Sequence, residues 1–191
     1  MTAATALPHP LSPAEWDVEW AHRDDAAELV EGIPTVAPPE SLINRRVAFV
    51  LASILDSHLP PRWLVVTDGG VETVRHAGRH TVRVPDVVVL PRRGDLTRSR
   101  VLGTDVALLA EIVSPSSIEV DWIRKRREYA SAGVPAYLVV DAGADGSREP
   151  RLTLFEDPAD GDFRRESGGS AVTLSLASTA VHLTMDRLLE A

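Results

Sequence analysis

The sequence contains no cysteine, and only one of its 20 basic side chains, Lys125, is a lysine. Without cysteine the chain forms no disulfide and offers no thiolate as a nucleophile or metal ligand, which is compatible with a reducing compartment. No apolar run approaches the roughly 18 residues that a membrane helix needs. The first residues also lack the basic start and the long apolar stretch of a signal peptide. These absences predict a cytoplasmic protein without membrane contact.

The chain has 191 residues and a formal net charge of -8 at pH 7. This charge argues against non-specific DNA binding, which depends on Lys and Arg neutralising many phosphates. It is still compatible with a local basic site, and acidic clusters also serve as metal ligands. The length fits one domain with appendages. We expect an N-terminal arm with a short helix, a core domain, and a C-terminal hairpin-like segment with a short helix that packs on the core, over residues 1–24, 25–158 and 159–191.

Hydrophobic periodicity predicts one α/β (or α+β) domain with a mixed sheet. A short helix starts after Ser12, with Glu15 completing a capping pattern, and a long amphipathic helix starts at Ser41. Residues 105–142 have the pattern of a strand, a helix and a strand, which favours a parallel pair with a right-handed crossover. The helix of this passage ends at Gly133, the residue type that most often follows a helix.

Finer expectations concern how the strands pair. Strands over residues 62–69 and 70–76 flank an Asp-Gly-Gly sequence, which predicts a hairpin. Residues 81–91 have the pattern of one strand, and residues 151–157 that of an edge strand. The last helix is predicted over Thr184–Glu190.

Two acidic residues interrupt strands that are otherwise apolar. Asp86 follows a proline in VRVPDVVVLP, and Glu111 lies in VALLAEIVSPSS. A buried carboxylate without a partner is costly, so each residue lies at a solvated strand end, pairs with an arginine, or serves a function. Two such residues on successive strands supply the hard oxygen ligands that Mg²⁺ or Mn²⁺ requires.

The single lysine lies on the helix after Glu111, among Arg124, Arg126 and Arg127. The chain uses arginine at every other basic position, so the retained ammonium predicts a chemical role. An ammonium can lose its proton when its pKa is lowered, whereas a guanidinium stays charged. The competing interpretation of Lys125 is an exposed helix charge, which is the commoner fate of a single lysine.

Five short motifs occur in order and with fitting gaps: ELVEG, VPDVVVLP, AEIVSPSS, then Asp121, Lys125 and Tyr129, and finally AGVPAYLVVD. Together they resemble a bacterial, restriction-endonuclease-type branch of the PD-(D/E)XK nuclease superfamily. The resemblance covers roughly Ala27 to Phe155, most of the chain. It implies the restriction endonuclease-like fold, a mixed β-sheet flanked by helices in a single domain.

The resemblance also implies the main site residues. Asp86 matches the first acidic residue and Glu111 the second, and the carbonyl of Ile112 is a further candidate metal ligand. The usual lysine two residues after the second acid is missing, because Val113 stands there. In this branch the next helix supplies that lysine, which places it at Lys125.

Two further correspondences are less direct. Glu31, with Glu28 as the alternative, matches the acidic residue of the family's early strand. Relatives carry a histidine at the start of the first long helix, where this chain has Ile43 and Asn44. A role for that histidine in substrate contact or in supporting the site is therefore not expected here.

The implied activity is a Mg²⁺-dependent (or Mn²⁺-dependent) endonuclease that hydrolyses phosphodiester bonds in DNA. Asp86 and Glu111 would hold the metal, which lowers the pKa of a bound water. Lys125 would orient or deprotonate that water, and Glu31 would bind metal or hold the lysine. By analogy with double-strand cutters, which commonly pair two sites, a homodimer is expected.

Two other interpretations stay open. A catalytically inactive, nuclease-like scaffold that binds nucleic acid or protein agrees with the net charge of -8 and the missing histidine. A hydrolase could also use Asp86 and Glu111 as an acid/base pair without metal.

Several other residues have a weaker functional pattern. Seven arginines would form either a rim that faces phosphates or a solvated surface: Arg92, Arg93, Arg98, Arg100, Arg124, Arg126 and Arg127. Tyr129 and Tyr137 are predicted to pack in the core. His76 and His80 have the spacing of a zinc pair, but they flank a predicted turn and no third ligand lies nearby in the sequence.

Overall fold

The structure is a computed structural model that describes residues 9–20, 27–36, 38–76, 79–93, 97–114, 117–143, 148–176 and 178–190. Its helical elements are α1 (Pro13–Glu19), α2 (Leu42–His58), the 3-10 helix η1 (Gly103–Asp105), the π-helix η2 (Val120–Lys125), α3 (Arg126–Ser131) and α4 (Met185–Leu189). No helix among the described residues is long and apolar enough to cross a membrane.

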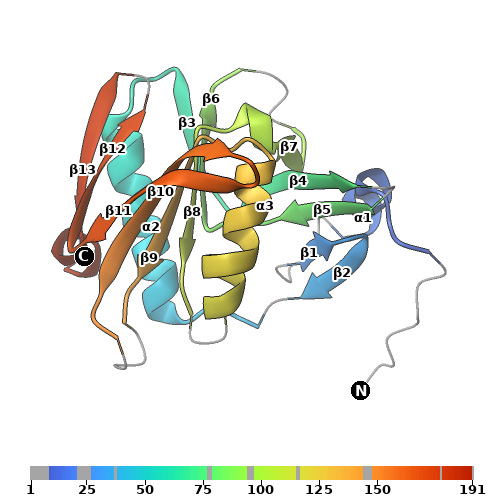
Figure 1. Cartoon of the computed structure of the whole chain (residues 1–191), viewed down its shortest axis with the longest axis horizontal. Coiled ribbons are helices and arrows are strands. Elements are labelled where there is room, and N and C mark those ends of the chain that lie inside the picture. Colours follow the sequence, from blue (N-terminus) through green and yellow to red (C-terminus); the bar gives the residue numbers. More distant parts are fainter. Residues whose placement is uncertain are drawn as a thin grey trace.

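A six-stranded mixed sheet forms the centre of the molecule (Figure 1). Its strands in spatial order are β11 (Asp162–Gly169), β10 (Arg151–Ala159), β9 (Ala136–Asp141), β8 (Leu108–Ile112), β6 (Val87–Pro91) and β3 (Trp63–Thr67). The β8–β9 pair is parallel and the other pairs are antiparallel. This confirms the parallel pair that the sequence predicts, with η2 and α3 between the two strands.

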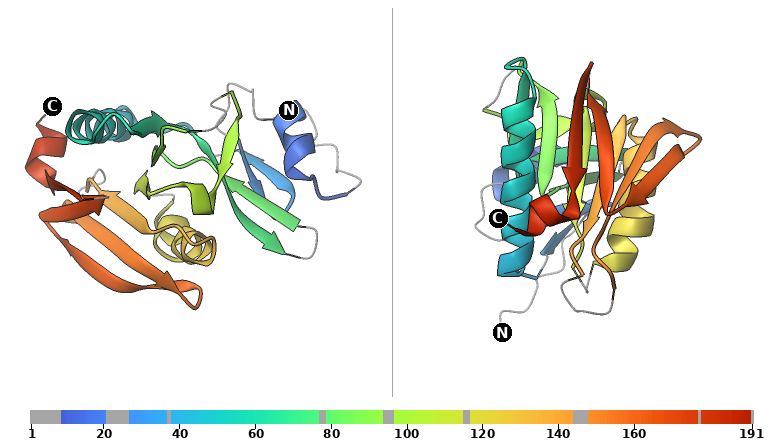
Figure 2. Two further views of the ribbon diagram at one scale, coloured as in Figure 1. Left: turned by 90° about the horizontal axis from the view of Figure 1, so that it is seen from above. Right: turned by 90° about the vertical axis from the view of Figure 1, so that its left-hand side faces the viewer.

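Helices α2 and α3 lie on opposite faces of this sheet (Figure 2). Because side chains alternate between the two faces of a strand, Val87 and Val89 share a core with α2, whereas Val88 and Leu90 share a core with α3. In β8 the same alternation places Leu109 toward α3. Glu111, two residues further, therefore points to the α3 face as well.

A second, five-stranded sheet extends from the central one, next to α1 (Figure 1). Its strands in spatial order are β2 (Ile33–Val36), β1 (Ala27–Val30), β5 (Arg79–Arg83), β4 (Gly70–His76) and β7 (Arg100–Leu102). The predicted capping of α1 is present, since Ser12 and Glu15 form a reciprocal capping box. Strands β1 and β2 pair on either side of a turn that contains Gly32, which has a φ of 82°.

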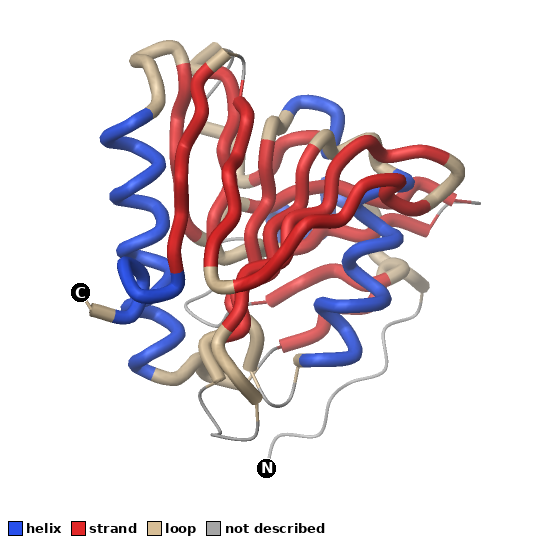
Figure 3. The backbone as a smooth tube through the Cα atoms, turned by 60° about the vertical axis from the view of Figure 1, so that its left-hand side comes forward, coloured by secondary structure: helices blue, strands red, loops and turns tan. Residues whose placement is uncertain are grey.

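The C-terminal residues add an antiparallel hairpin of β12 (Ala171–Leu176) and β13 (Thr179–Thr184), followed by α4. Figure 3 shows this hairpin beside α2. Its apolar face joins the same core as α2 and one face of the central sheet, through residues such as Leu174, Val181 and Leu188. Strand β11, which precedes the hairpin, pairs with β10 and forms an edge of the central sheet.

Three of the strand predictions are wrong. Strands β3 and β4 do not form a hairpin, because β3 pairs with β6 in the central sheet and β4 pairs with β5 and β7 in the other. Residues 81–91 form two strands, β5 and β6, in different sheets. Pro85 has no N–H to donate to a ladder, which explains a break there. Strand β10 is an interior strand between β9 and β11.

The two mixed sheets with helices on their faces confirm the single α+β domain that the sequence predicts. The break between β5 and β6 is where the chain passes from one sheet to the other. Asp86 lies in this crossing, directly before the first residue of β6.

Candidate functional site

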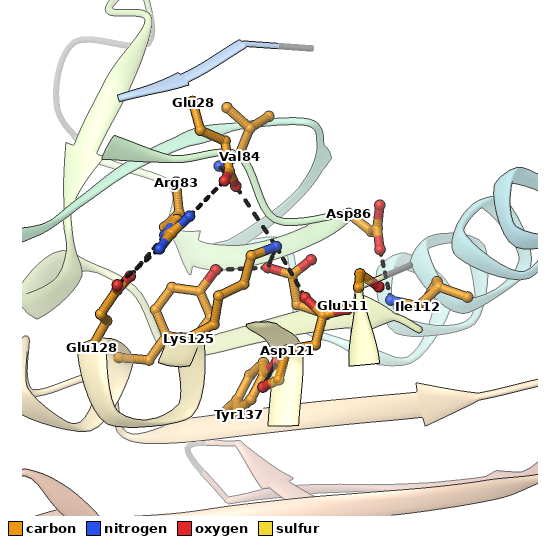
Figure 4. Close-up of polar contacts among 12 residues, drawn as sticks. Glu28, Arg83, Val84, Asp86, Glu111, Ile112, Asp121, Lys125, Glu128 and Tyr137 are labelled. Carbon is orange, nitrogen blue, oxygen red and sulfur yellow. Dashed lines mark hydrogen bonds and ion pairs between the residues drawn. The ribbon is translucent and has the colours of Figure 1, made fainter. Parts of the chain in front are cut away.

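The structure brings Asp86, Glu111 and Lys125 together where the two sheets meet (Figure 4). Asp86 comes from the crossing between β5 and β6, Glu111 from β8, and Lys125 from the last residue of η2. Lys125 is buried, with only 10% of its side chain exposed. The interpretation of this lysine as an exposed helix charge is therefore wrong.

The ammonium of Lys125 lies among three carboxylates. Its Nζ is 2.9 Å from Oε1 of Glu111, 3.2 Å from Oδ1 of Asp121 and 3.6 Å from Oε1 of Glu28. The hydroxyl of Tyr129, which is fully buried, donates to Oε1 of Glu111 at 2.6 Å. Tyr129 therefore packs in the core as predicted and, in addition, fixes one oxygen of the buried acid.

Of the two early glutamates, the structure brings Glu28 to this cluster and not Glu31. Glu28 accepts a hydrogen bond from the backbone N–H of Val84 at 3.2 Å, and its carboxylate approaches Lys125. Glu31 lies in the turn after β1 with a φ of 51°, and its exposed side chain pairs with the exposed Arg79. The residue with the weaker sequence match is thus the one that lies at the site.

Asp86 is tied to β8 by a short hydrogen bond. The backbone N–H of Ile112 donates to its Oδ2 at 2.6 Å. An extended residue directs its N–H and C=O to the same edge of a strand, so the Ile112 carbonyl faces the same edge as Asp86. This places the three predicted metal ligands in one region of the structure.

Burial dominates the electrostatics of both acids. It raises the pKa of Asp86 to about 7, although the N–H of Ile112 and the charge of Lys125 act to lower it. Burial likewise raises the pKa of Glu111 well above its usual value, against the influence of Lys125. Neighbouring carboxyl groups raise both pKa values further: Glu40 and Asp121 that of Asp86, and Asp121, Asp86 and Glu28 that of Glu111.

For Lys125, neighbouring charges outweigh burial in setting the pKa. Burial acts to lower the pKa of Lys125, but Glu111, Glu28 and Asp121 together outweigh it and hold the pKa above its usual value. The ammonium therefore keeps its proton at neutral pH. Of the two roles that the sequence offers Lys125, this environment disfavours deprotonating a water and favours donating hydrogen bonds.

The donor set suits Mg²⁺ or Mn²⁺. Among the residues that the structure describes, no group of three His, Cys, Asp or Glu side chains is arranged to hold an ion alone. Mg²⁺ is usually bound by one or two carboxylates and keeps several waters, so Asp86, Glu111 and the Ile112 carbonyl fit that habit. Four carboxyl groups interact with the one ammonium of Lys125, and a divalent cation would add positive charge among them.

Asn44, one of the two residues at which the resemblance leads us to expect a histidine in relatives, lies close to this region. It is 2% exposed, and its Nδ2 donates to Oε2 of Glu40 at 2.9 Å and to the Val113 carbonyl at 3.4 Å. Glu40 in turn raises the pKa of Asp86 electrostatically. Ile43 is 41% exposed. Through its hydrogen bond to Val113, Asn44 therefore connects the start of α2 to the end of β8. This structural role does not require a side chain that titrates.

The arginines divide into two groups. Arg100 pairs with Glu72 at 2.7 Å, and Arg126 pairs with Asp162 at 2.7 Å, so these two are engaged within the fold. Arg124 and Arg127 are exposed on the helix that carries Lys125. A rim that faces phosphates stays a prediction for the exposed members. His80 contacts Glu72, and the side chain of His76 lies outside the described residues.

The raised pKa of Asp86 predicts a pH-dependent effect of Asp86→Asn. The folded-state pKa of about 7 exceeds the ordinary 3.8, so the unfolded chain releases its proton first as the pH rises. This group therefore weakens folding progressively between about pH 4 and pH 7, and the full cost remains above pH 7. Asparagine can still accept the Ile112 hydrogen bond but carries no charge.

In chelator at pH 8, we expect Asp86→Asn to be more stable than wild type by about 1–2 kcal/mol, after allowance for solvent screening of this half-buried group. This corresponds to a melting temperature about 3–6 °C higher, and the difference should vanish near pH 4. Thermal unfolding across this pH range measures it, with Asp160→Asn at an exposed position as control. A variant less stable than wild type at pH 8 would contradict the assignment.

The sequence contained a signal for two residues that it did not predict at the site. Asp121 and Tyr129 lie four residues before and four residues after Lys125. Residues at this spacing share one face of a helix, and all three are buried on the face toward β8. Arg83 and Glu128, which contact this cluster, had no comparable signal.

All of these residues lie within the part of the chain that matches a known protein family. Residues 14–186 match the family Uma2, described as "Putative restriction endonuclease". Among solved structures, the chain is similar to "a putative nuclease belonging to DUF820 from Anabaena variabilis ATCC 29413", with a TM-score of 0.63 and 15% sequence identity. The similarity covers 86% of this chain and 89% of that one, and it confirms the nuclease-like fold. No curated protein matches the sequence.

Proposed function

Because the chain belongs to the Uma2 restriction-endonuclease family of the PD-(D/E)XK superfamily, we propose that it is a metal-dependent endonuclease that hydrolyses phosphodiester bonds in DNA. The observation that carries the proposal is that a buried carboxylate, Glu111, pairs with a buried ammonium, Lys125, while the half-buried Asp86 lies beside them. Lys125 Nζ lies 2.9 Å from Glu111, and Asp86 is joined to the neighbouring residue, Ile112, at 2.6 Å.

In this proposal Asp86, Glu111 and the Ile112 carbonyl hold Mg²⁺ or Mn²⁺. When bound, such an ion polarises the phosphate and lowers the pKa of a water that serves as nucleophile. The protein buries Glu111 and half-buries Asp86, which makes their electrostatic interactions stronger than in water. The hydrogen bond from Tyr129 fixes Glu111, and that from the Ile112 N–H fixes Asp86.

Lys125 supplies the positive charge of the site. Its pKa stays above the usual value because three carboxylates surround it, so it donates hydrogen bonds and opposes the negative charge that grows on a phosphate during hydrolysis. Glu28 takes the supporting role that the sequence assigned to Glu31, because it is Glu28 that contacts Lys125. A homodimer that pairs two such sites belongs to the same proposal.

The direct test is cleavage of DNA by the purified chain. Single-stranded, double-stranded and branched DNA would be incubated with Mg²⁺, with Mn²⁺ and with chelator. We expect cleavage with either metal and none with chelator. Binding without cleavage, unchanged by Lys125→Ala, would favour a non-catalytic scaffold. Cleavage that survives chelator would favour acid/base catalysis by the two carboxyl groups without metal.

A further inference from the structure

Arg83, the last residue of β5, joins three parts of the fold next to the site. Its guanidinium is almost fully buried, with 3% of the side chain exposed. Nη1 donates to Oε2 of Glu28 at 2.7 Å, while Nε and Nη2 donate to the two oxygens of Glu128 at 2.7 and 2.8 Å. Figure 4 shows Arg83 between these two glutamates.

The contact with Glu128 is bidentate, with two parallel N–H to oxygen bonds. Such a contact fixes both distance and orientation, and the planar guanidinium is the group that makes it. Because Glu128 lies on α3, the contact sets the position of this helix against β5. The third donor of Arg83 holds Glu28, so the same side chain also sets the position of β1.

Both partners of Arg83 are linked to Lys125. Glu128 is three residues after Lys125 on the same continuous helical segment. Holding Glu128 therefore fixes the rotation of this segment about its axis, and with it the direction in which Lys125 points toward Glu111. Glu28 accepts from Arg83 through Oε2 and approaches Lys125 with Oε1. Arg83 therefore influences the ammonium in two ways: through Glu128 on the helix that carries Lys125, and through Glu28, which contacts Lys125 directly.

We propose that Arg83 and Glu128 form a positioning clamp that holds Lys125 and Glu28 in their places at the site. In this proposal Arg83 and Glu128 act through the position of Lys125, and neither is assigned to bind metal or phosphate. The expected effect of the clamp on turnover rests on the proposed nuclease function. The expected effect of the clamp on the position of Lys125 is independent of that function. In metal sites, residues that hold the ligands in place typically affect activity or metal affinity 10- to 100-fold when they are replaced.

Two substitutions test the clamp without adding a second lysine. Arg83→Gln removes the guanidinium and its two parallel hydrogen bonds to Glu128, and Glu128→Gln keeps the shape but loses the charge. The matched control is Arg79→Gln on the same strand, where Arg79 and Glu31 form an exposed pair with 62% and 63% of their side chains exposed. Thermal unfolding establishes that each variant is folded.

The position of Lys125 can be measured without an activity assay, because it is the only lysine of the chain. Protein labelled with ¹³C-lysine gives one ε-methylene signal, which reports the surroundings of this ammonium. We expect both clamp variants to shift or broaden this signal and to lower kcat about 10- to 100-fold, with KM for DNA within about twofold. Arg79→Gln should match wild type in every readout.

Folded clamp variants with a wild-type lysine signal and a wild-type kcat would overturn the proposal. Loss of the folded state in both variants would assign the pair to stability alone and overturn it as well. If the wild-type protein cleaves no DNA, the proposed function fails and the lysine signal decides the clamp by itself. A shifted signal then supports the clamp, and an unmoved signal overturns it.

Discussion

Replacing Lys125 with methionine should lower the free energy of unfolding by about 3–5 kcal/mol at pH 8 in the absence of metal. The ammonium is the shared partner of Glu28, Glu111 and Asp121, each of which has a carboxylate oxygen within 3.6 Å of Nζ. Its removal leaves Glu111 and Asp121 buried without a cation within salt-bridge reach among the residues described. Methionine fills a similar volume, so the loss reflects charge and not a cavity.

Chemical denaturation of wild type and Lys125→Met measures this cost. The control is Arg164→Met, since Arg164 and Asp160 also form an ion pair between positions i and i+4, but with 62% and 90% of the side chains exposed. Its expected change is within about 0.5 kcal/mol. Adding Mn²⁺ should restore part of the stability of Lys125→Met, because a cation that binds the folded state stabilises it. Equal stabilities of Lys125→Met and wild type would show that the lysine does not compensate these acids.

Glu111→Gln should reduce metal-dependent cleavage on the order of 100-fold or more, because it removes a charged oxygen ligand from the buried site. The amide oxygen of glutamine can still accept from Tyr129 and Lys125, which lie 2.6 and 2.9 Å from Oε1. Burial raises the pKa of Glu111, so ionised Glu111 is a cost to folding. The variant should therefore unfold at the wild-type temperature or above.

Initial rates of DNA cleavage at several Mn²⁺ concentrations, together with thermal unfolding, measure both effects. Glu166→Gln on β11 is the control, because Glu166 is exposed on the same sheet. A folded Glu111→Gln variant with wild-type activity would remove Glu111 from the metal site. Loss of activity together with loss of the fold would point to a structural role.

Local patterns in the sequence predicted the elements around the site well. The apolar run that contains Glu111 is a strand buried at every position, and the following helix carries Lys125 as expected. These predictions hold because a buried strand and a helix are specified by residues that are close in sequence. Burial of both faces of β8 requires apolar residues at nearly every position, which makes an acid within it conspicuous.

Pairing between distant strands was predicted less well. The Asp-Gly-Gly sequence predicted a hairpin, but β3 and β4 belong to different sheets. Asp68 has a φ of 54°, so the turn residues have turn geometry while the chain changes sheet instead of reversing within one. The pattern of a turn does not say which sheet the next strand joins.

The choice between Glu28 and Glu31 depended on three-dimensional placement in the same way. Both lie in one short motif, and the family match favoured Glu31. The structure places Glu31 in the turn between β1 and β2, whereas Glu28 lies within β1, opposite Arg83 and Lys125. The partners of Glu28 are 55 and 97 residues away in the sequence, and no local pattern contains that information.

The central claim is that a divalent metal binds between Asp86 and Glu111, beside Lys125. Line broadening of the single lysine ε-methylene signal by paramagnetic Mn²⁺ tests it most directly, because Lys125 is the only lysine in the chain. We expect stoichiometric Mn²⁺ to broaden the signal in wild type, chelator to restore it, and both Asp86→Asn and Glu111→Gln to prevent the broadening. A lysine signal that stays sharp in wild-type protein with excess Mn²⁺ would contradict the claim.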